Sequence, residues 1–149
     1  MGADGPQELT HIEAFQLLAT VPLGRVVFTD RALPAIRPVN HIVDGRDIIF
    51  RTSSSAAITT AVDGIGTIVA YEADAIDSAR RAGWSVVVVG GARLLTDTTQ
   101  IEHYRQLLQP WAPGDKDDFI AIRADVVSGV RLIGDEQPGP QEDQESQDP

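Results

Sequence analysis

Two patterns of apolar residues occur between positions 10 and 133, one typical of short helices and the other of β-strands. Thr10 and Glu13 form a capping box ahead of an apolar helical face, so a first helix is expected there and should end by Pro22. Asp97 and Gln100 form a second capping box, which predicts a helix that runs to about residue 109. These caps give two of the three expected helices.

The remaining apolar segments favour strands, separated by turn-forming residues. Strands are expected at residues 24–29, 35–43, 47–52, 67–71, 83–95, 119–123 and 127–133. Asp44-Gly45 is a hairpin signal that makes the first three an antiparallel meander. The valine run 86–89 predicts burial on both faces, Gly90-Gly91 suggests a bulge or bend, and the polar residues 74–82 are expected to form a loop.

These elements predict a mainly β (α+β) fold. Hairpin signals outnumber strand-helix-strand patterns, so the residues favour a small antiparallel barrel of about seven strands flanked by about three helices. The chain has 149 residues, which suits one domain, expected at residues 10–133. Residues 1–9 and 134–149 are polar and rich in Gly, Pro, Gln or acids, so both are expected to be disordered tails, the second strongly acidic.

Charge and composition exclude several functional classes. The 12 Lys and Arg against 22 Asp and Glu give a net charge of −10, the wrong sign for holding nucleic acid. There is no cysteine, which excludes disulfides and thiolate chemistry and suits a reducing compartment. The longest apolar run is too short to cross a membrane, and the N-terminus lacks a signal-peptide core. We therefore expect a cytoplasmic protein with neither a nucleic-acid nor a membrane partner.

Metal chemistry is not favoured. The chain has three histidines, His11, His41 and His103, and no spacing brings two of them onto one local face. The acidic residues 115, 117 and 118 do not match a calcium loop and enclose Lys116, so a solvated turn is favoured there. No metal site is predicted.

Two short motifs resemble catalytic or nucleotide-binding signatures, but the residues and predicted elements beside them do not match those signatures. Gly83-Trp84-Ser85 begins like a nucleophile elbow, but Val87 replaces its closing glycine and a strand follows instead of a helix. Gly64-Ile65-Gly66 precedes a strand, whereas the dinucleotide fingerprint must follow one. Neither serine hydrolysis nor dinucleotide binding of that type is expected.

One group of residues suits an anion. Arg37 lies on one strand, Arg51-Thr52 ends its hairpin partner, and Ser53-Ser54-Ser55 leads into a short helix at 56–62. Helix N-terminal amides, hydroxyls and guanidinium groups together suit a phosphate. Equally, the hydroxyls could only cap the helix while the arginines pair with surface acids.

Several segments, taken in order, resemble the pyridoxamine 5'-phosphate oxidase-like flavin-binding split barrels, especially small actinobacterial members. They are Leu33–His41, Asp44-Gly45, Ile49–Thr52, Gly83–Val86, Trp111–Gly114 and Phe119–Arg123. The resemblance covers about residues 10–133 and implies a six-stranded split barrel. It also implies a homodimer with two cofactor clefts at the subunit interface, which hold flavin mononucleotide (FMN) or, in some relatives, a deazaflavin or haem.

The resemblance also assigns cofactor-binding residues. Pro38, Val39 and Asn40 resemble the strand whose backbone lines the isoalloxazine ring. The segment from Arg51 through Thr52 and Ser53 to Ser55 resembles the phosphate-binding strand end and turn, beside Arg37. Trp84 and Ser85 match a segment that reaches the cofactor from the partner subunit. No catalytic side chain is assigned.

One position departs from the family pattern. Relatives usually place a phosphate-binding lysine after the hydroxyl-rich turn, and this chain has Ala57 there. Arg51 or Arg37 could compensate, or the site could be weak, empty or adapted to another ligand. Because the segment from Arg51 to Ser55 matches the family's phosphate site, the leading hypothesis is a flavin-dependent oxidoreductase acting on a small-molecule substrate. The alternative is a noncatalytic split-barrel protein that binds flavin, deazaflavin or haem.

Overall fold

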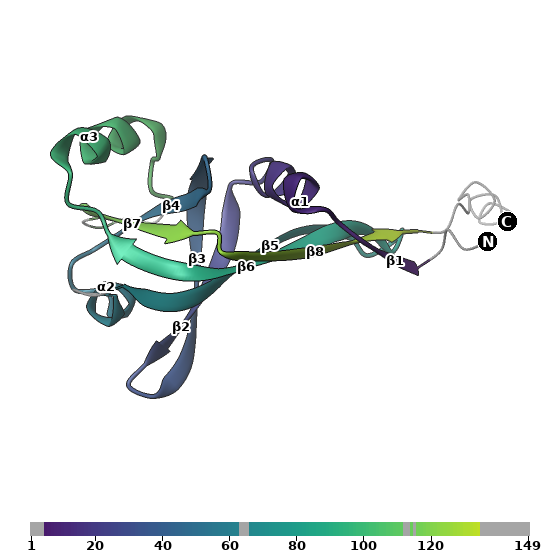
Figure 1. Ribbon diagram of the computed structural model, residues 1–149, viewed down its shortest axis with the longest axis horizontal. Helices are drawn as coiled ribbons and strands as arrows, with labels where there is room; N and C mark the ends of the chain where they lie inside the picture. The colour runs from purple at the N-terminus through teal and green to yellow at the C-terminus, as the bar shows by residue number, and fades with distance from the viewer. Residues whose placement is uncertain (1–4, 63–65, 112–113, 115, 135–149) are drawn as a thin grey trace, which may run out of the picture.

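The computed structural model describes residues 5–62, 66–111, 114 and 116–134, which form eight strands and three helices (Figure 1). The strands are β1 (Gly5–Glu8), β2 (Leu23–Asp30), β3 (Leu33–Asp44), β4 (Asp47–Thr52), β5 (Thr67–Asp77), β6 (Ala82–Leu94), β7 (Asp118–Arg123) and β8 (Val126–Ile133). The helices are α1 (His11–Leu18), α2 (Ala57–Ala61) and α3 (Thr98–Leu107). The tails expected at residues 1–4 and 135–149 lie outside the described residues.

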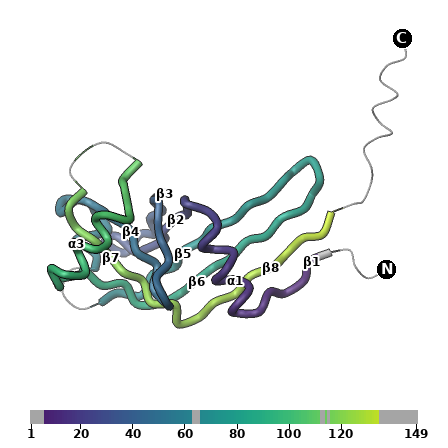
Figure 2. Tube along the Cα trace, turned by 90° about the horizontal axis from the view of Figure 1, so that it is seen from above, coloured from purple at the N-terminus to yellow at the C-terminus, as the bar shows by residue number. Residues whose placement is uncertain are grey.

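Six strands close an antiparallel barrel. The sheet order is β1-β8-β6-β5-β2-β3-β4-β7, and a further pairing of β6 with β7 closes the ring. Strands β8 and β1 extend the sheet from β6, beside the long β5–β6 hairpin that projects from the barrel (Figure 2). The prediction of a mainly β split barrel with three flanking helices is confirmed, with eight strands in place of seven.

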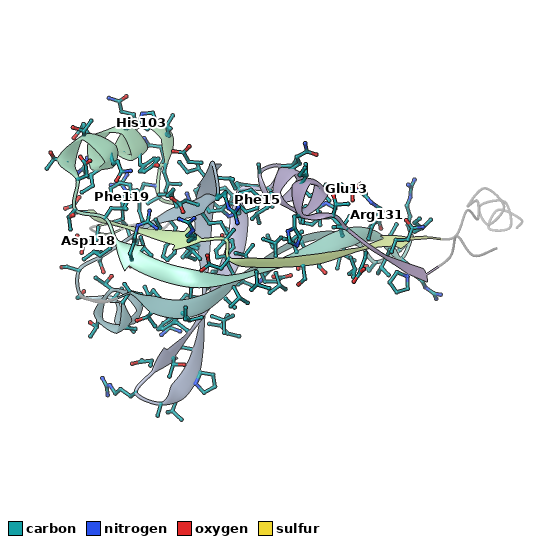
Figure 3. All side chains as sticks on the ribbon, in the orientation of Figure 1. Glu13, Phe15, His103, Asp118, Phe119 and Arg131 are labelled. Carbon is teal, nitrogen blue, oxygen red and sulfur yellow. The ribbon has the colours of Figure 1, made fainter. Side chains whose placement is uncertain are left out.

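Helix α1 begins as its capping box predicts. The Thr10 hydroxyl accepts from the Glu13 amide at 3.1 Å, and the Glu13 carboxylate accepts from the Thr10 amide at 2.9 Å. Leu18 and Ala14 are fully buried against the barrel, and Phe15 points from the same helix toward the strands (Figure 3). In α3, Asp97 caps the Thr99 amide at 2.9 Å.

Two layers of apolar side chains explain the strongly apolar strands β4 and β7. Ile48 and Phe50 of β4 face the barrel interior, whereas Ile49 faces the other way and packs under α3. Phe119 of β7 likewise packs in the α3 layer (Figure 3). Both strands are therefore buried on both faces, which removes the usual alternation.

Two expectations about individual segments are wrong. Residues 5–8, assigned to the N-terminal tail, form β1, because they pair with β8. Residues 74–82 are not a loop: β5 continues to Asp77 and β6 begins at Ala82. Ala75, Ile76 and Asp77 are all exposed at this end of the hairpin, so the strand has no buried face there that the sequence could indicate.

The valine run is also buried differently from the prediction. Val86 and Val88 are fully buried, but Val87 alternates onto an exposed face of β6. At Gly90, β6 leaves β8, and from Ala92 it pairs with β7. The β5–β6 register continues unbroken through this point, so the glycine pair makes no bulge against β5.

Candidate cofactor site

A cavity of about 270 Å³ opens between β3, the end of β4, the start of α2 and the segment after α3. It is lined by Arg37, Pro38, Val39, Asn40, Arg51, Thr52, Ala56, Ala57, Ile58, Pro110, Trp111 and Lys116. Six of the ten predicted cofactor residues are among them, so the structure brings the two main sequence segments of the predicted site together.

The split between β3 and β4 creates this cavity. Residues 33–40 of β3 pair with β2, and only residues 41–44 pair with β4. Within the described part of the chain, the other edge of residues 33–40 therefore has no strand partner. Backbone amides and carbonyls along this edge can bind a polar ring.

The lining is positively charged. Arg37, Arg51 and Lys116 line the cavity, and no Asp or Glu belongs to its described lining. In a chain with almost twice as many acids as bases, this local excess of cations favours an anionic ligand.

Arg51 holds the segment after α3 against the barrel. Its Nε donates to the Lys116 carbonyl at 2.9 Å, and one terminal nitrogen donates to the Leu108 carbonyl at 3.0 Å. Its guanidinium lies 5.1 Å from the centre of the Phe119 ring. Two of its three nitrogens thus bind backbone carbonyls, which makes Arg51 a residue that positions this segment.

Asn40 binds the same segment from β3. Its side-chain nitrogen donates to the Gln109 carbonyl at 2.7 Å, and its oxygen accepts from the Trp111 amide at 3.4 Å. Trp111, an exposed aromatic residue, is thereby placed at the rim of the cavity.

The serine turn does not cap α2. The N-cap is Ala56, which makes no side-chain cap hydrogen bond, so the expected serine cap is wrong. The Ser53 and Ser55 hydroxyls lie 3.4 Å apart, and neither residue lines the cavity. Thr52 is buried there, and its hydroxyl lies 3.4 Å from that of Thr59. Helix α2 starts too late for these serines to reach its first amides.

Trp84 and Ser85 lie apart from the cavity. The Trp84 side chain is only 7% exposed and belongs to the core of its own barrel. Ser85 lies on the opposite face of β6, between Asp74 and Val130 of the neighbouring strands. We therefore treat Trp84 as a core residue, because a side chain buried in its own subunit cannot extend to another.

A buried polar network joins β3 to the end of α1 and to β5. The His41 Nε2 lies 3.1 Å from the Leu18 carbonyl, and its Nδ1 is hydrogen-bonded to the Tyr71 hydroxyl. Burial lowers the pKa of His41, while the Leu18 carbonyl opposes this effect. Burial raises the pKa of Tyr71. Both groups are accordingly neutral, and their role here is to join α1 to the barrel.

Sequence reasoning missed Lys116 and Trp111 as site residues. Lys116 was interpreted as part of a solvated acidic turn, and it reaches the cavity only through contacts such as the one with Arg51, 65 residues away. Asp115 of that turn lies outside the described residues. No local pattern signals such a contact.

Comparison with known proteins identifies the class. The family model described as pyridoxamine 5'-phosphate oxidase matches residues 10–132. The chain belongs to this family, as its resemblance predicted. A Mycobacterium tuberculosis (strain H37Rv) relative, the uncharacterised protein Rv0080, is 50% identical in an alignment of 132 residues that covers 86% of this chain and 86% of the relative.

Solved structures agree with this assignment. A candidate pyridoxamine 5'-phosphate oxidase from Corynebacterium glutamicum has a TM-score of 0.74 and 31% identity, covering 91% of this chain and all of that one. The FAD-binding protein of Mycobacterium smegmatis has a TM-score of 0.71 and 28% identity, covering 85% of this chain and 98% of that one.

The described residues contain neither a membrane-spanning helix nor a metal-binding cluster. Across the described ranges, no helix is both long and apolar enough to span a membrane. The same residues contain no cluster of three or more histidine or acidic side chains that could hold a metal ion.

Proposed function

We propose that this protein is a flavin-dependent oxidoreductase that uses FMN and acts on a small organic molecule. The observation that carries the proposal is the cation-lined cavity, free of acids in its described lining, at the open edge of β3. The M. smegmatis relative with the same fold binds FAD, which supports a flavin nucleotide.

The residues of the cavity suit such a cofactor. The unpaired edge at Pro38–Asn40 offers backbone groups to the polar side of the flavin ring. The Thr52 hydroxyl and the cationic side chains suit its phosphate. A bound flavin would supply electron transfer between a reductant and the substrate, and the chain would orient the ring and exclude water.

We also propose that the protein is a homodimer with the cofactor sites beside the interface. On the outer face of the sheet, one apolar row crosses five paired strands: Val126, Val89, Ala70, Val27 and Ile36. We call this set the outer apolar row. Its end residues are 59% and 58% exposed, which is costly for apolar side chains unless a partner covers them.

The outer apolar row leads directly to the cavity. Ile36, at one end of the row, is followed along β3 by the cavity residues Arg37 and Pro38. A second subunit packed on the row would therefore lie next to the cavity and could complete it. This arrangement would make flavin affinity depend on protein concentration.

Oxidation of pyridoxamine phosphate itself is not favoured. A phosphate-bearing substrate needs a second cationic cluster, and Arg93 pairs with Asp47 at 3.1 Å while Arg123 pairs with Asp125 at 3.5 Å. These arginines are separate from the cavity lining and are already paired. We expect a substrate without a phosphate group.

Flavin titration tests the proposal. We expect the purified protein to quench the fluorescence of FMN saturably, and FAD, a deazaflavin and haem serve as competitors. The loaded protein should then oxidise a reduced nicotinamide over many turnovers in the presence of an electron acceptor. Saturable binding with no more than one turnover would favour the noncatalytic alternative, and no flavin binding at micromolar concentration would reject the flavin assignment.

A further inference from the structure

The cavity has one cation whose side chain no described contact occupies. Arg51 binds two backbone carbonyls. Arg37 donates to the Ile36 carbonyl at 2.9 Å and lies 5.9 Å from the centre of the Phe28 ring. No described residue forms an ion pair with Lys116.

Lys116 precedes β7 and lines the same cavity as Thr52, the residue that ends β4. Asp118, two residues further along, pairs with Thr52 in the β4–β7 ladder. The bond from Arg51 to the Lys116 carbonyl holds the backbone there. Lys116 and Ala57 then line one cavity, although 59 positions separate them in the sequence.

The described acids next to Lys116 are engaged elsewhere. Asp117 forms an ion pair with Arg105 of α3 at 3.5 Å. Asp118 is the first residue of β7, and it pairs with Thr52 of β4 in the sheet. Neither residue lines the cavity. The ammonium group of Lys116 is therefore the local charge best placed to meet an incoming anion.

We propose that Lys116 binds the phosphoryl group of the flavin nucleotide and replaces, from another segment that lines the same cavity, the cation that is missing at Ala57. This inference rests on the proposed flavin function. A lysine ammonium can donate to phosphate oxygens directly, and a charge-assisted bond of this kind changes affinity about tenfold or more. Arg51 acts through Lys116 by fixing its backbone.

The test compares FMN with riboflavin, which has the same ring and no phosphate. Lys116→Gln should weaken FMN binding about tenfold and change riboflavin binding less than about twofold. Arg123→Gln removes the same charge from a β7 residue outside the cavity lining, so it should leave both affinities unchanged. Adding Ala57→Lys to the Lys116→Gln chain should restore FMN binding, because both positions line one cavity.

Each outcome is decisive. Equal loss of FMN and riboflavin binding in Lys116→Gln would point to a structural role for Lys116. Unchanged FMN binding would show that Lys116 is not a ligand. Either result overturns the inference about Lys116 and leaves the flavin proposal standing. If the wild-type protein quenches neither flavin, the flavin proposal and this inference both fail. Fluorescence titration supplies all of these results without any activity measurement.

Discussion

His41 is held in a single tautomer by its two partners. The Leu18 carbonyl can only accept, so His41 Nε2 carries the proton, and the unprotonated Nδ1 accepts from the Tyr71 hydroxyl. This arrangement satisfies two buried side chains and the end of α1 at once. A second proton would place a charge in a site that water hardly reaches.

The lowered pKa of His41 makes stability depend on pH. The unfolded chain takes up this proton near the ordinary histidine value of about 6.5, before the folded chain does. Acidification through that value should therefore lower the free energy of unfolding, by at most about 1.4 kcal/mol per pH unit. At pH values well above the ordinary histidine pKa, the contribution of His41 to the free energy of unfolding should be constant.

Urea unfolding at about pH 7.5 and about pH 5.5 measures this effect. We expect His41→Gln to lose less stability on acidification than the wild type. His103, exposed on α3 (Figure 3), provides the control, and His103→Gln should follow the wild type. Equal losses in the wild type and His41→Gln would contradict the prediction.

Among the elements, β6 has the most demanding packing, because it changes partners along its length. Its first part pairs with β8 and its last part with β7. At the change, the Asp125 amide donates to the Val89 carbonyl at 3.2 Å, so the β7–β8 connection passes close over β6. A Cβ at Gly90 would overlap the Arg123 carbonyl oxygen, whereas one at Gly91 would meet open space.

These two glycines make a matched pair of substitutions. Gly90→Ala should lower the free energy of unfolding by about 2 kcal/mol or more, because the backbone must move to admit a methyl group. Gly91→Ala should stay within about 0.5 kcal/mol of the wild type. Chemical denaturation of both variants checks this, and similar losses at the two positions would argue against the close approach.

The sequence predicted most elements because their caps and turns are local. The Thr10 box and the Asp44-Gly45 hairpin depend on residues a few positions apart, and both are confirmed. The β5–β6 hairpin was missed beyond Tyr71, because its end at Ala75–Asp77 is exposed on both faces and so has no alternation of buried and exposed residues. Lys116 was missed because its place is set by Arg51, a contact that no local pattern encodes.

At the scale of the whole molecule, the outer apolar row determines the expected assembly. Val126→Glu places a charge at its exposed end and should shift the protein toward monomers of 16.0 kDa in sedimentation. Ile12→Glu is the control: Ile12 is 71% exposed on α1 and shares a surface hollow with Val127, which faces the opposite side of β8 from Val126, so the same charge there should leave the dimer intact. A wild-type monomer at micromolar concentration would refute the dimer.

The open edge of β3 has a second consequence, for solubility. An unpaired strand edge can recruit strands from other molecules, which leads to aggregation. Pro34 and Pro38 lie within residues 33–40, and neither has an amide hydrogen to offer a foreign strand. The same stretch of β3 that lines the cavity thus resists edge-to-edge association between copies of the chain.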